Sequence, residues 1–453
     1  MSTHAPRLDE THDPAVQSWV ESANDPATDF PIQNLPIAAY EAQHDGHSHA
    51  HYATIIGDQV LDVSMLVEAG ALGRERDEED LAEALQMPHA FGLLRFPELR
   101  RQLRRIIHRF LRADTVAGQS VRRLRSKVLR PLADTTLIEP VAIFNYTDFY
   151  ASIHHATTVG AMFRPDNPLL PNYKWVPIGY HGRASSIVVS GADIRRPNGQ
   201  SKADDAPAPS FGPSRMLDYE LEVGCVVGPG NLLGTPVSIQ NAREHIAGLC
   251  LVNDWSARDF QKWEYQPLGP FLAKNFATTI SPCLVTLEAL EPFRCPAYRR
   301  PAGDPAPLPH LLDETDQALG GFDLTLEVSL QSKQMAAQGL PPIRLSTGNA
   351  FRDMYWTFAQ MLTHHTSNGC NLQPGDLLAS GTVSGPTPDS RGCLLELTWD
   401  GPGKPRKPIA LPTGETRTFL ADGDTLILRG YAQREGFRRI GFGECRGTIL
   451  PAT

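Results

Sequence analysis

The segment LDYELEVGCVV, residues 217–227, places two carboxylates two positions apart in an alternating pattern of apolar and polar residues. Successive side chains of a β-strand point to opposite faces, so one face would take the apolar residues and the other would take Asp218, Glu220 and Glu222. Glu220 and Glu222 could then hold one metal ion together. The solvated face of an ordinary strand gives the same local pattern, so the rest of the chain has to decide between the two interpretations.

The composition favours a protein that acts on small molecules. The chain has 453 residues, 41% of them hydrophobic, which is enough for a large core and about two domains. Its net charge of −9 gives no general attraction for nucleic acid or anionic lipid, so neither is expected as a partner. The seven cysteines contain no CxxC pair, and no export signal or long apolar stretch is evident. These features predict reduced thiols and a cytoplasmic location.

Three regions are expected along the chain. Residues 1–28 are polar and predict a loosely ordered arm, and residues 29–138 predict a small N-terminal domain. Residues 52–66 alternate around the turn signal Gly57-Asp58, which is typical of a hairpin. The stretch RRQLRRIIHRFLR, residues 100–112, predicts an amphipathic helix with a solvated basic face.

The third region, residues 139–453, has many short apolar runs separated by proline and glycine, such as LEVGCVV, IAGLCLVND, LTLEVSL and CLLELTW. This texture predicts a larger, mainly β domain, and the whole chain is expected to be of the α+β class. One clear helix is expected over residues 350–365, where apolar residues keep helical spacing. The proline-rich residues 299–310 predict a surface excursion.

Two further acidic residues extend the pair of glutamates. Asp148, in FNYTDFYASIHHA, and Asp254, in LCLVNDWSARDF, each lie where a strand would pass into a loop. Four carboxylates without cysteine or histidine suit Mg2+, Ca2+ or Mn2+, because hard cations prefer oxygen ligands. The sequence therefore offers a complete ligand set, although the spacing alone does not bring the four together.

A histidine close to Asp148 could act as a general base. His154 and His155 are both candidates, because the ordinary pKa of histidine lies near working pH. A histidine that is only hydrogen-bonded in a loop is the alternative, and it applies equally to His181, His364 and His365.

The run DWSARDFQKWEYQPLGPFLAK supplies hydrogen-bond donors close to Asp254. Such donors could stabilise an oxyanion that develops during a reaction. An exposed loop also collects polar residues, so this alternative stays open. The donors are Arg258, Gln261, Tyr265 and Lys274.

Several long motifs, in order, resemble the fumarylacetoacetate hydrolase family. They are YTDFYASIHHATTVGAMFR, GYHGRASSIVVSG, LDYELEVGCVVGPGN, NDWSARDFQKWEYQPLGPFLAK, TGNAFRDMYWTFAQMLTHHTSNGCNLQPGDLLASGT and RRIGFGEC. The resemblance extends from about Phe30 to the C-terminus. It implies an SH3-like N-terminal β domain followed by a mixed β-roll catalytic domain. It also implies a homodimer that hydrolyses a carbon–carbon bond of a diketo acid, fumarylacetoacetate, to fumarate and acetoacetate in tyrosine and phenylalanine breakdown.

The resemblance also implies roles for particular residues. His155, oriented by Glu396, would activate water, and Arg258, Gln261 and Lys274 would stabilise charge on substrate oxygens. The substrate-contacting positions would be Tyr150, Arg164, Tyr180, Gln261, Tyr265 and Thr382. The metal would be held by Asp148, Glu220, Glu222 and Asp254, with Lys274 and Thr278 adjoining them.

Ala273 and Ala277 stand where close relatives are expected to carry glycine, which leaves metal choice and turnover rate open. A hydrolase of related acylpyruvates and a non-catalytic metal-binding protein are the alternative functions. The intact set of acidic and histidine residues disfavours the non-catalytic alternative.

Overall fold

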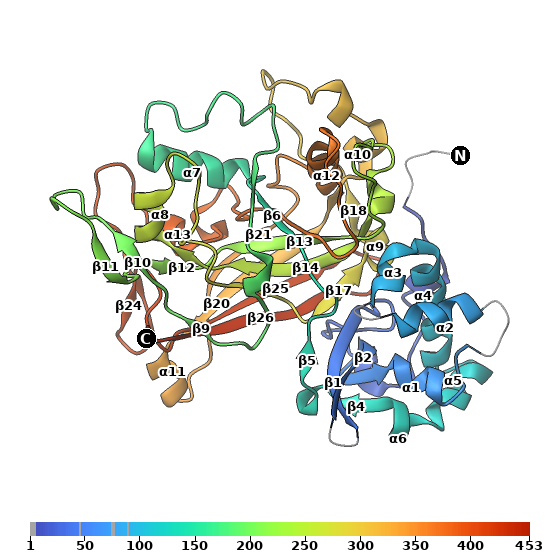
Figure 1. Cartoon of the computed structure of the whole chain (residues 1–453). Coiled ribbons are helices and arrows are strands. Elements are labelled where there is room, and N and C mark those ends of the chain that lie inside the picture. Colours follow the sequence, from blue (N-terminus) through green and yellow to red (C-terminus); the bar gives the residue numbers. More distant parts are fainter. Residues whose placement is uncertain (1–5, 45–46, 74–77, 88–89) are drawn as a thin grey trace.

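The computed structural model describes residues 6–44, 47–73, 78–87 and 90–453 (Figure 1). It shows a mixed α and β protein in which an N-terminal unit packs against a larger C-terminal part. Among the described residues, none of the helices has the length and apolar character needed to cross a membrane.

The N-terminal unit combines a small antiparallel arrangement of strands with a group of helices. The hairpin predicted around Gly57 is confirmed: β2 and β3 pair from Ile56 and Gln59 outward, and Gly57 takes a φ of 57°, which favours glycine. The strands are β1 (Ile37–His44), β2 (His47–Ile56), β3 (Gln59–Asp62), β4 (Leu129–Pro131) and β5 (Leu137–Ile138). The helices are α1 (Val63–Glu68), α2 (Glu79–Gln86), α3 (Phe91–Arg95), α4 (Pro97–Leu111), α5 (Val116–Arg122) and α6 (Arg125–Val128).

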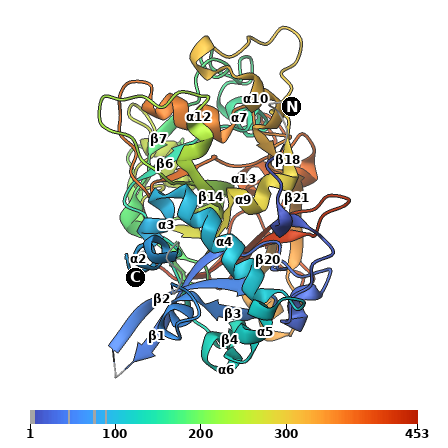
Figure 2. The ribbon, with the colours of Figure 1, turned by 90° about the vertical axis from the view of Figure 1, so that its right-hand side faces the viewer.

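The predicted basic helix exists as α4, but the expectation that its arginines are solvated is wrong for Arg100 and Arg104, which are both buried. Arg100 donates to both oxygens of Glu288, in the C-terminal part, at 3.1 Å each. Arg104 donates to Thr11 and to two backbone carbonyls of residues 33 and 34. Through these side chains helix α4 joins the two parts of the molecule. Figure 2 shows α4 on the side of the molecule that faces the viewer.

The expectation of a loosely ordered arm is wrong for residues 6–28. Two short 3-10 helices, Glu10–His12 and Glu21–Asn24, form there. His12 lies 2.7 Å from the carbonyl of Glu288 through Nε2, and the indole of Trp19 donates to the carbonyl of Phe110. Thr11, His12 and Ser18 of this segment are buried, which composition alone could not indicate.

A long mixed sheet runs through both parts of the molecule. Its main path is β4-β3-β2-β1-β17-β14-β13-β22-β6-β7, so β1 of the N-terminal unit pairs directly with β17 of the C-terminal part. The new strands on this path are β6 (Tyr146–Phe149), β7 (Gly179–His181), β13 (Leu221–Val227), β14 (Ile246–Asp254), β17 (Cys283–Thr286) and β22 (Leu377–Ala379), with β8 (Ile187–Val189) and β16 (Thr278–Ile280) alongside.

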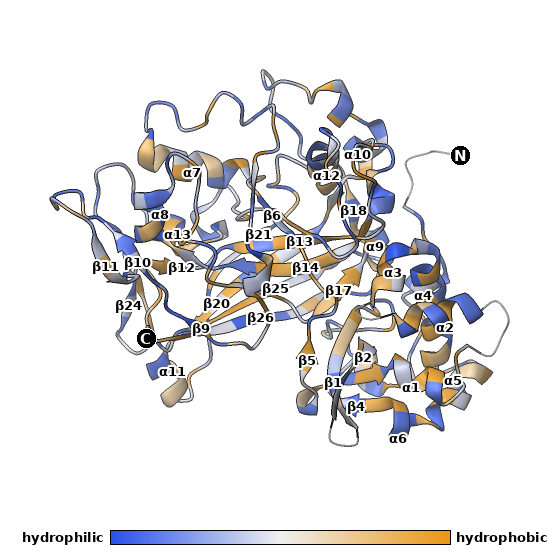
Figure 3. Ribbon diagram, in the orientation of Figure 1, coloured by the Kyte–Doolittle hydropathy of each residue, from blue (hydrophilic) through white to orange (hydrophobic). Residues whose placement is uncertain are grey.

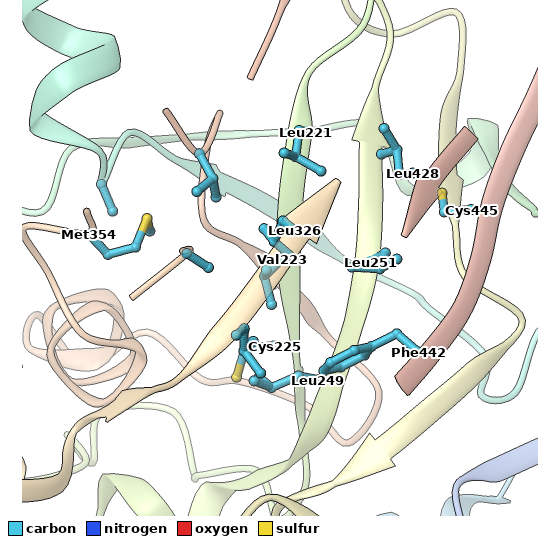
Figure 4. Packing of buried hydrophobic residues seen from close by; sticks show 14 of the residues in the cluster. Leu221, Val223, Cys225, Leu249, Leu251, Leu326, Met354, Leu428, Phe442 and Cys445 are labelled. Carbon is cyan, nitrogen blue, oxygen red and sulfur yellow. The ribbon is translucent and has the colours of Figure 1, made fainter. Parts of the chain in front are cut away.

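A second sheet packs against the first. Its order is β21-β20-β25-β26-β9, formed by β21 (Ile343–Asn349), β20 (Leu324–Gln331), β25 (Thr425–Ala432), β26 (Ile440–Leu450) and β9 (Ile194–Arg195). Hydrophobic residues follow the central strands, whereas hydrophilic residues gather on the outer loops and helices (Figure 3). The core between the sheets includes Leu221, Val223, Leu251, Leu326 and Phe442 (Figure 4). Every residue of β13 and β14 is buried, so these strands are covered on both faces.

Shorter elements complete the C-terminal part. The helices are α7 (Ile153–Phe163), α8 (Arg258–Glu264), α9 (Leu287–Leu290), α10 (Glu314–Leu319), α11 (Lys333–Ala337), α12 (Phe358–Thr366) and α13 (Leu394–Leu397). The short strands are β10 (Asn198–Ser201), β11 (Ser210–Pro213), β12 (Leu217–Asp218), β15 (Ser256–Ala257), β18 (Arg294–Cys295), β19 (Gly321–Phe322), β23 (Ile409–Ala410) and β24 (Thr416–Arg417).

The helix expected over residues 350–365 begins later, at Phe358. Thr357 and Gln360 form a capping box that fixes this start, and the Thr357 hydroxyl also bonds to Asp316. Residues 350–356 include large buried side chains in an irregular segment, so their apolar spacing reflects burial instead of a helix. The run CLLELTW, expected to be β-rich, forms the short helix α13.

The proline-rich residues 299–310 lie outside strands and α-helices, as predicted. They nevertheless pack against the body of the protein. The Arg300 guanidinium stacks on the rings of Tyr355 and Trp356, at 4.2 and 4.4 Å from the two centroids.

Candidate active site

The four predicted carboxylates converge in one buried cluster. Asp148 comes from β6, Glu222 from β13, Glu220 from the residue just before β13, and Asp254 from the end of β14. One oxygen from each carboxylate lies within 4.8 Å of the others, and all four residues are buried. The order β6-β22-β13-β14 explains the convergence, because it brings these strands together although Asp148 and Asp254 are far apart in sequence.

The strand predicted over residues 217–227 is interrupted between β12 and β13. Asn253 accepts a hydrogen bond from the backbone N–H of Glu220 at 3.2 Å, and Asp254 donates its N–H to the carbonyl of Glu220. The N–H of Tyr219 bonds to the side chain of Asp218. Hydrogen bonds to the end of β14 and to the Asp218 side chain thus hold the backbone at the point where Glu220 enters the cluster.

Several donors surround the cluster. The Lys274 ammonium lies 2.5 Å from Glu220 Oε2 and 2.7 Å from Asp254 Oδ2. Thr278 donates to Asp254 Oδ1 at 3.0 Å, and the Tyr180 hydroxyl donates to Asp254 Oδ2 at 3.1 Å. Asp254 and Glu220 are therefore well supplied with hydrogen bonds.

The remaining two carboxylates are much less compensated. Both oxygens of Glu222 and Oδ1 of Asp148 are buried without a hydrogen-bond partner. Burial is the largest cause that raises the pKa of Glu222 well above its ordinary value, and the charges of Asp148 and Asp254 add to it. Burial and the charge of Asp254 raise the pKa of Asp148 in the same way. Burial also acts on Glu220, but Lys274 and Arg258 outweigh it and lower the pKa of that carboxyl.

These residues fit a divalent cation. An excess of negative charge in a buried cluster of oxygen donors is costly unless a cation balances it. The unpartnered oxygens of Glu222 and Asp148 supply the free lone pairs that Mg2+, Ca2+ or Mn2+ would need, and the donor set contains no sulfur or imidazole.

A histidine–glutamate pair is the second part of the site. Nδ1 of His155 lies 2.6 Å from Oε2 of Glu396, and both side chains are buried. His155 lies in the first turn of α7, whose N-cap residue Ser152 accepts a hydrogen bond from the backbone N–H of His155 at 3.3 Å. Although burial alone would raise the pKa of Glu396, His155 and the Ser384 hydroxyl lower it. An ionised Glu396 makes Nδ1 the donor and leaves Nε2 free to accept a proton.

The structure separates the two neighbouring histidines. His154 is half-buried and lies 3.9 Å from Asp353, away from Glu396. The ring of Tyr150 packs edge-on against His155, with the centroids 5.3 Å apart. Only His155 of this pair is therefore in contact with Glu396.

The other sequence-predicted residues fall into an inner and an outer group. Arg258 is buried and donates to Glu220 Oε1 at 2.6 Å and to Gln261 Oε1 at 3.1 Å. Thr382 is buried as well. Arg164 is exposed at the end of α7, where it bonds to the carbonyl of Pro168, and Tyr265 packs against Phe163 with the ring centroids 5.9 Å apart.

Sequence reasoning missed the residues that hold Glu396. Ser384 donates to Glu396 Oε2 at 2.5 Å, Arg391 lies 3.5 Å from Oε1, and the Cys393 thiol lies 3.4 Å from Oε2. Asp218 was noted only as part of the strand pattern, yet it bonds to Arg258. Ser384, Arg391 and Cys393 all lie within 12 residues of Glu396, but no recognised motif marks these spacings; Asp218 is far from Arg258 in the sequence.

A cavity of about 430 Å³ lies elsewhere, between the arm, α4 and α9. Its lining alternates arginines and acidic residues that pair with one another, including Arg100 with Glu288 and Arg243 with Glu291. No residue of the acidic cluster or of the histidine–glutamate pair lines this cavity.

The fold and the site define an enzyme that sets a histidine–glutamate pair and buried cationic donors beside an acidic cluster on a mixed sheet. The chain belongs to the fumarylacetoacetase family and is a hydrolase. Residues 145–450 match the family model described as "Fumarylacetoacetate (FAA) hydrolase C-terminal", and residues 33–140 match "Fumarylacetoacetase N-terminal".

Full-length relatives support this assignment. The chain is 47% identical over 444 residues to the fumarylacetoacetase of Arabidopsis thaliana, covering 96% of this chain and 99% of the relative. It is 45% identical to the fumarylacetoacetase of Bos taurus and 46% identical to that of Homo sapiens, with the same coverage. A solved fumarylacetoacetate hydrolase from Exiguobacterium antarcticum aligns with a TM-score of 0.46 at 18% identity, covering 92% of this chain and 99% of that one.

Proposed function

We propose that this chain hydrolyses the carbon–carbon bond of fumarylacetoacetate to give fumarate and acetoacetate, the last step of tyrosine and phenylalanine breakdown. The observation that carries this proposal is the buried contact of 2.6 Å between His155 Nδ1 and Glu396 Oε2 in a chain of this family. In this proposal the pair supplies the base that accepts a proton from water.

His155 is the base in this proposal. Its Nε2 takes a proton from water, and the ionised Glu396 stabilises the imidazolium that forms and fixes the ring orientation. The resulting hydroxide attacks the carbonyl beside the fumaroyl group. The edge-on contact of Tyr150 restricts the His155 ring further.

Arg258, Gln261 and Lys274 stabilise the alkoxide formed by this attack. Gln261 uses Oε1 to accept from Arg258, so its amide N–H groups remain available as donors. The buried Lys274 and Arg258 are held in place by carboxylates, and preorganised donors of this kind stabilise charge without reorganising during the reaction.

Cleavage of the tetrahedral species requires a stabilised carbanion as the leaving group. Asp148, Glu220, Glu222 and Asp254 would hold Mg2+, Ca2+ or Mn2+, with Lys274 and Thr278 adjoining them. When bound, the cation supplies positive charge that favours the enolate form of the acetoacetate product. Lys274 keeps Glu220 and Asp254 oriented toward the same point.

The substrate carries a carboxylate at each end, which gives the outer residues a role. Tyr150, Tyr180, Tyr265, Gln261 and Thr382 would contact the substrate. Arg164, exposed at the end of α7, can pair with a substrate carboxylate without losing an internal ion pair. We also expect a cytoplasmic homodimer, which a light-scattering mass would test.

The test is the loss of fumarylacetoacetate absorbance with fumarate quantified as the product, in Mg2+, in Ca2+, in Mn2+ and after chelation. Metal-dependent release of fumarate is the expected result. A short acylpyruvate is the comparison substrate, and faster turnover of the acylpyruvate would overturn the substrate assignment. Absence of turnover on either substrate by folded protein would overturn the hydrolytic proposal.

A further inference from the structure

Asp218 lies at the junction of the parts that the proposed reaction uses. It is the last residue of β12, two positions before Glu220, and its exposed fraction is 0%. Oδ2 accepts from Nε of Arg258 at 2.9 Å, and Oδ1 accepts from the N–H of Tyr219 at 2.9 Å. These two contacts tie the carboxylate to its own strand and to the buried guanidinium.

The other contacts of Asp218 reach the helix that carries Glu396. The N–H of Leu394 donates to Oδ1 at 2.8 Å, and the N–H of Leu395 donates to Oδ2 at 2.9 Å. These are the first two residues of α13, and the N-cap residue of that helix, Cys393, makes no capping hydrogen bond with its side chain. Asp218 thus provides from a distant strand the cap that α13 lacks locally.

We propose that Asp218 is a positioning residue that fixes Arg258 and Glu396 in one mutual geometry. A carboxylate that accepts four hydrogen bonds, two on each oxygen, has no remaining freedom to rotate. It aligns the Arg258 guanidinium between itself and Glu220, and it anchors the turn from which Glu396 reaches His155. The donor for the alkoxide and the partner of the base are therefore set by one fully buried side chain.

The arrangement also explains why the residue is an aspartate. An asparagine of the same shape has one acceptor oxygen, so in either orientation its NH2 group would face two N–H donors. Two of the four hydrogen bonds would be lost. One of them holds the start of α13 in either orientation, and the other holds Arg258 or the N–H of Tyr219. Small displacements of catalytic groups reduce turnover more than they reduce substrate binding when the affected contacts strengthen in the transition state.

The inference rests on the proposed hydrolysis, and its test is the variant Asp218→Asn assayed on fumarylacetoacetate. We expect kcat to fall by about 30-fold or more, while KM changes by less than about threefold. The matched control is Asp424→Asn: Asp424 is equally buried and accepts from Arg417 at 2.8 and 2.9 Å and from the N–H of Ala421 at 2.8 Å. It contacts no residue of the site, so its kcat per folded molecule should stay within about twofold of wild type.

Loss of a buried charge could also prevent Asp218→Asn from folding. A second comparison therefore uses Arg258→Met with and without Asp218→Asn, because the double variant leaves no unpaired buried charge between these residues. We expect kcat of the double variant to be about tenfold lower than that of Arg258→Met. This difference would measure the contribution of Asp218 to the position of α13 and Glu396.

The outcomes separate the two proposals. Wild-type protein without turnover contradicts the proposed function. Wild-type turnover together with an Asp218→Asn kcat within about threefold of wild type, or with an equal loss in Asp424→Asn, overturns the positioning role alone. The same role is overturned if Arg258→Met and the double variant have equal kcat.

Discussion

Replacing Glu222 by glutamine should stabilise the metal-free protein and destabilise the metal-loaded protein relative to wild type. Glu222 is fully buried, neither oxygen has a hydrogen-bond partner, and its pKa is raised well above the ordinary value. Without a cation, the folded state must either bury this charge or keep a proton that the unfolded chain has released. Glutamine has neither cost.

The direction in which this stability difference changes with pH follows from proton linkage. Because the folded pKa is raised, the folded wild type binds more protons than the unfolded chain, and its stability falls as pH rises from the ordinary carboxyl pKa toward the folded value. Each pH unit in that interval lowers the free energy of unfolding by up to about 1.4 kcal/mol for one group. The advantage of Glu222→Gln should therefore grow as the pH rises above the ordinary carboxyl pKa.

A bound cation should make the wild type more stable than Glu222→Gln. A divalent ion at 100 times its Kd would stabilise the wild type by about 2.7 kcal/mol, whereas the variant has lost an anionic ligand. At ordinary unfolding entropies, 1 kcal/mol corresponds to about 1 °C for a chain of 453 residues, so saturating metal should raise the melting temperature of the wild type by about 3 °C.

The assay is thermal unfolding at pH 6, 7 and 8, with a chelator and with saturating Mg2+ or Ca2+. Glu291→Gln is the control, since Glu291 is also buried but pairs with Arg243 outside the cluster. It should lose stability under both conditions. A Glu222→Gln protein that melts below wild type in chelator at pH 8, or whose difference from wild type does not vary with pH, would refute the reasoning.

Three other outcomes test the site. His155→Ala should lower kcat by about 10²–10⁴-fold with metal affinity nearly intact, whereas His154→Ala should stay close to wild type; equal losses in steady-state assays would contradict the base assignment. Glu396→Gln should lower kcat by about 100-fold or more because it no longer favours the productive tautomer, and calorimetric metal titration should show unchanged binding; near-normal turnover would remove the pair from the mechanism. Gly381→Ala should destabilise the fold by at least about 1–2 kcal/mol in denaturant titration, since Gly381 has a φ of 75° and an added Cβ would lie 2.1 Å from the carbonyl oxygen of Phe149; unchanged stability would contradict this packing argument.

The sequence predicted local features well where a residue type has a single structural or chemical role. Alternation around Gly57 gave the hairpin, and hard oxygen donors in LDYELEV indicated a carboxylate cluster that the structure assembles. Residues 350–357 show where prediction from spacing fails. Their apolar residues are spaced as in a helix because they are buried in an irregular segment, and the helix itself begins only after the capping box at Thr357. The SH3-like description, the homodimer and the domain limits stay predictions.

Long-range contacts account for most of what the sequence could not predict. In the sequence, Arg100 and Arg104 look like part of a solvated helix face. They are buried because Glu288 and the N-terminal segment pack against them. In the same way, Ser384 and Asp218 carry no local signal for a role beside Glu396. Such roles depend on which loops the sheet order brings together.

The sheet order also has a consequence for biosynthesis. All four cluster carboxylates precede residue 255, yet β6, which carries Asp148, joins the sheet by pairing with β22 at Leu377–Ala379. A ribosome adding about 5–20 residues per second would take roughly 6–25 s to travel from Asp254, the last of the four carboxylates, to β22. During that interval the nascent chain holds every ligand but lacks the strand that places Asp148 beside Glu222. A chain truncated before Leu377 would carry the complete ligand set in its sequence and could not assemble it.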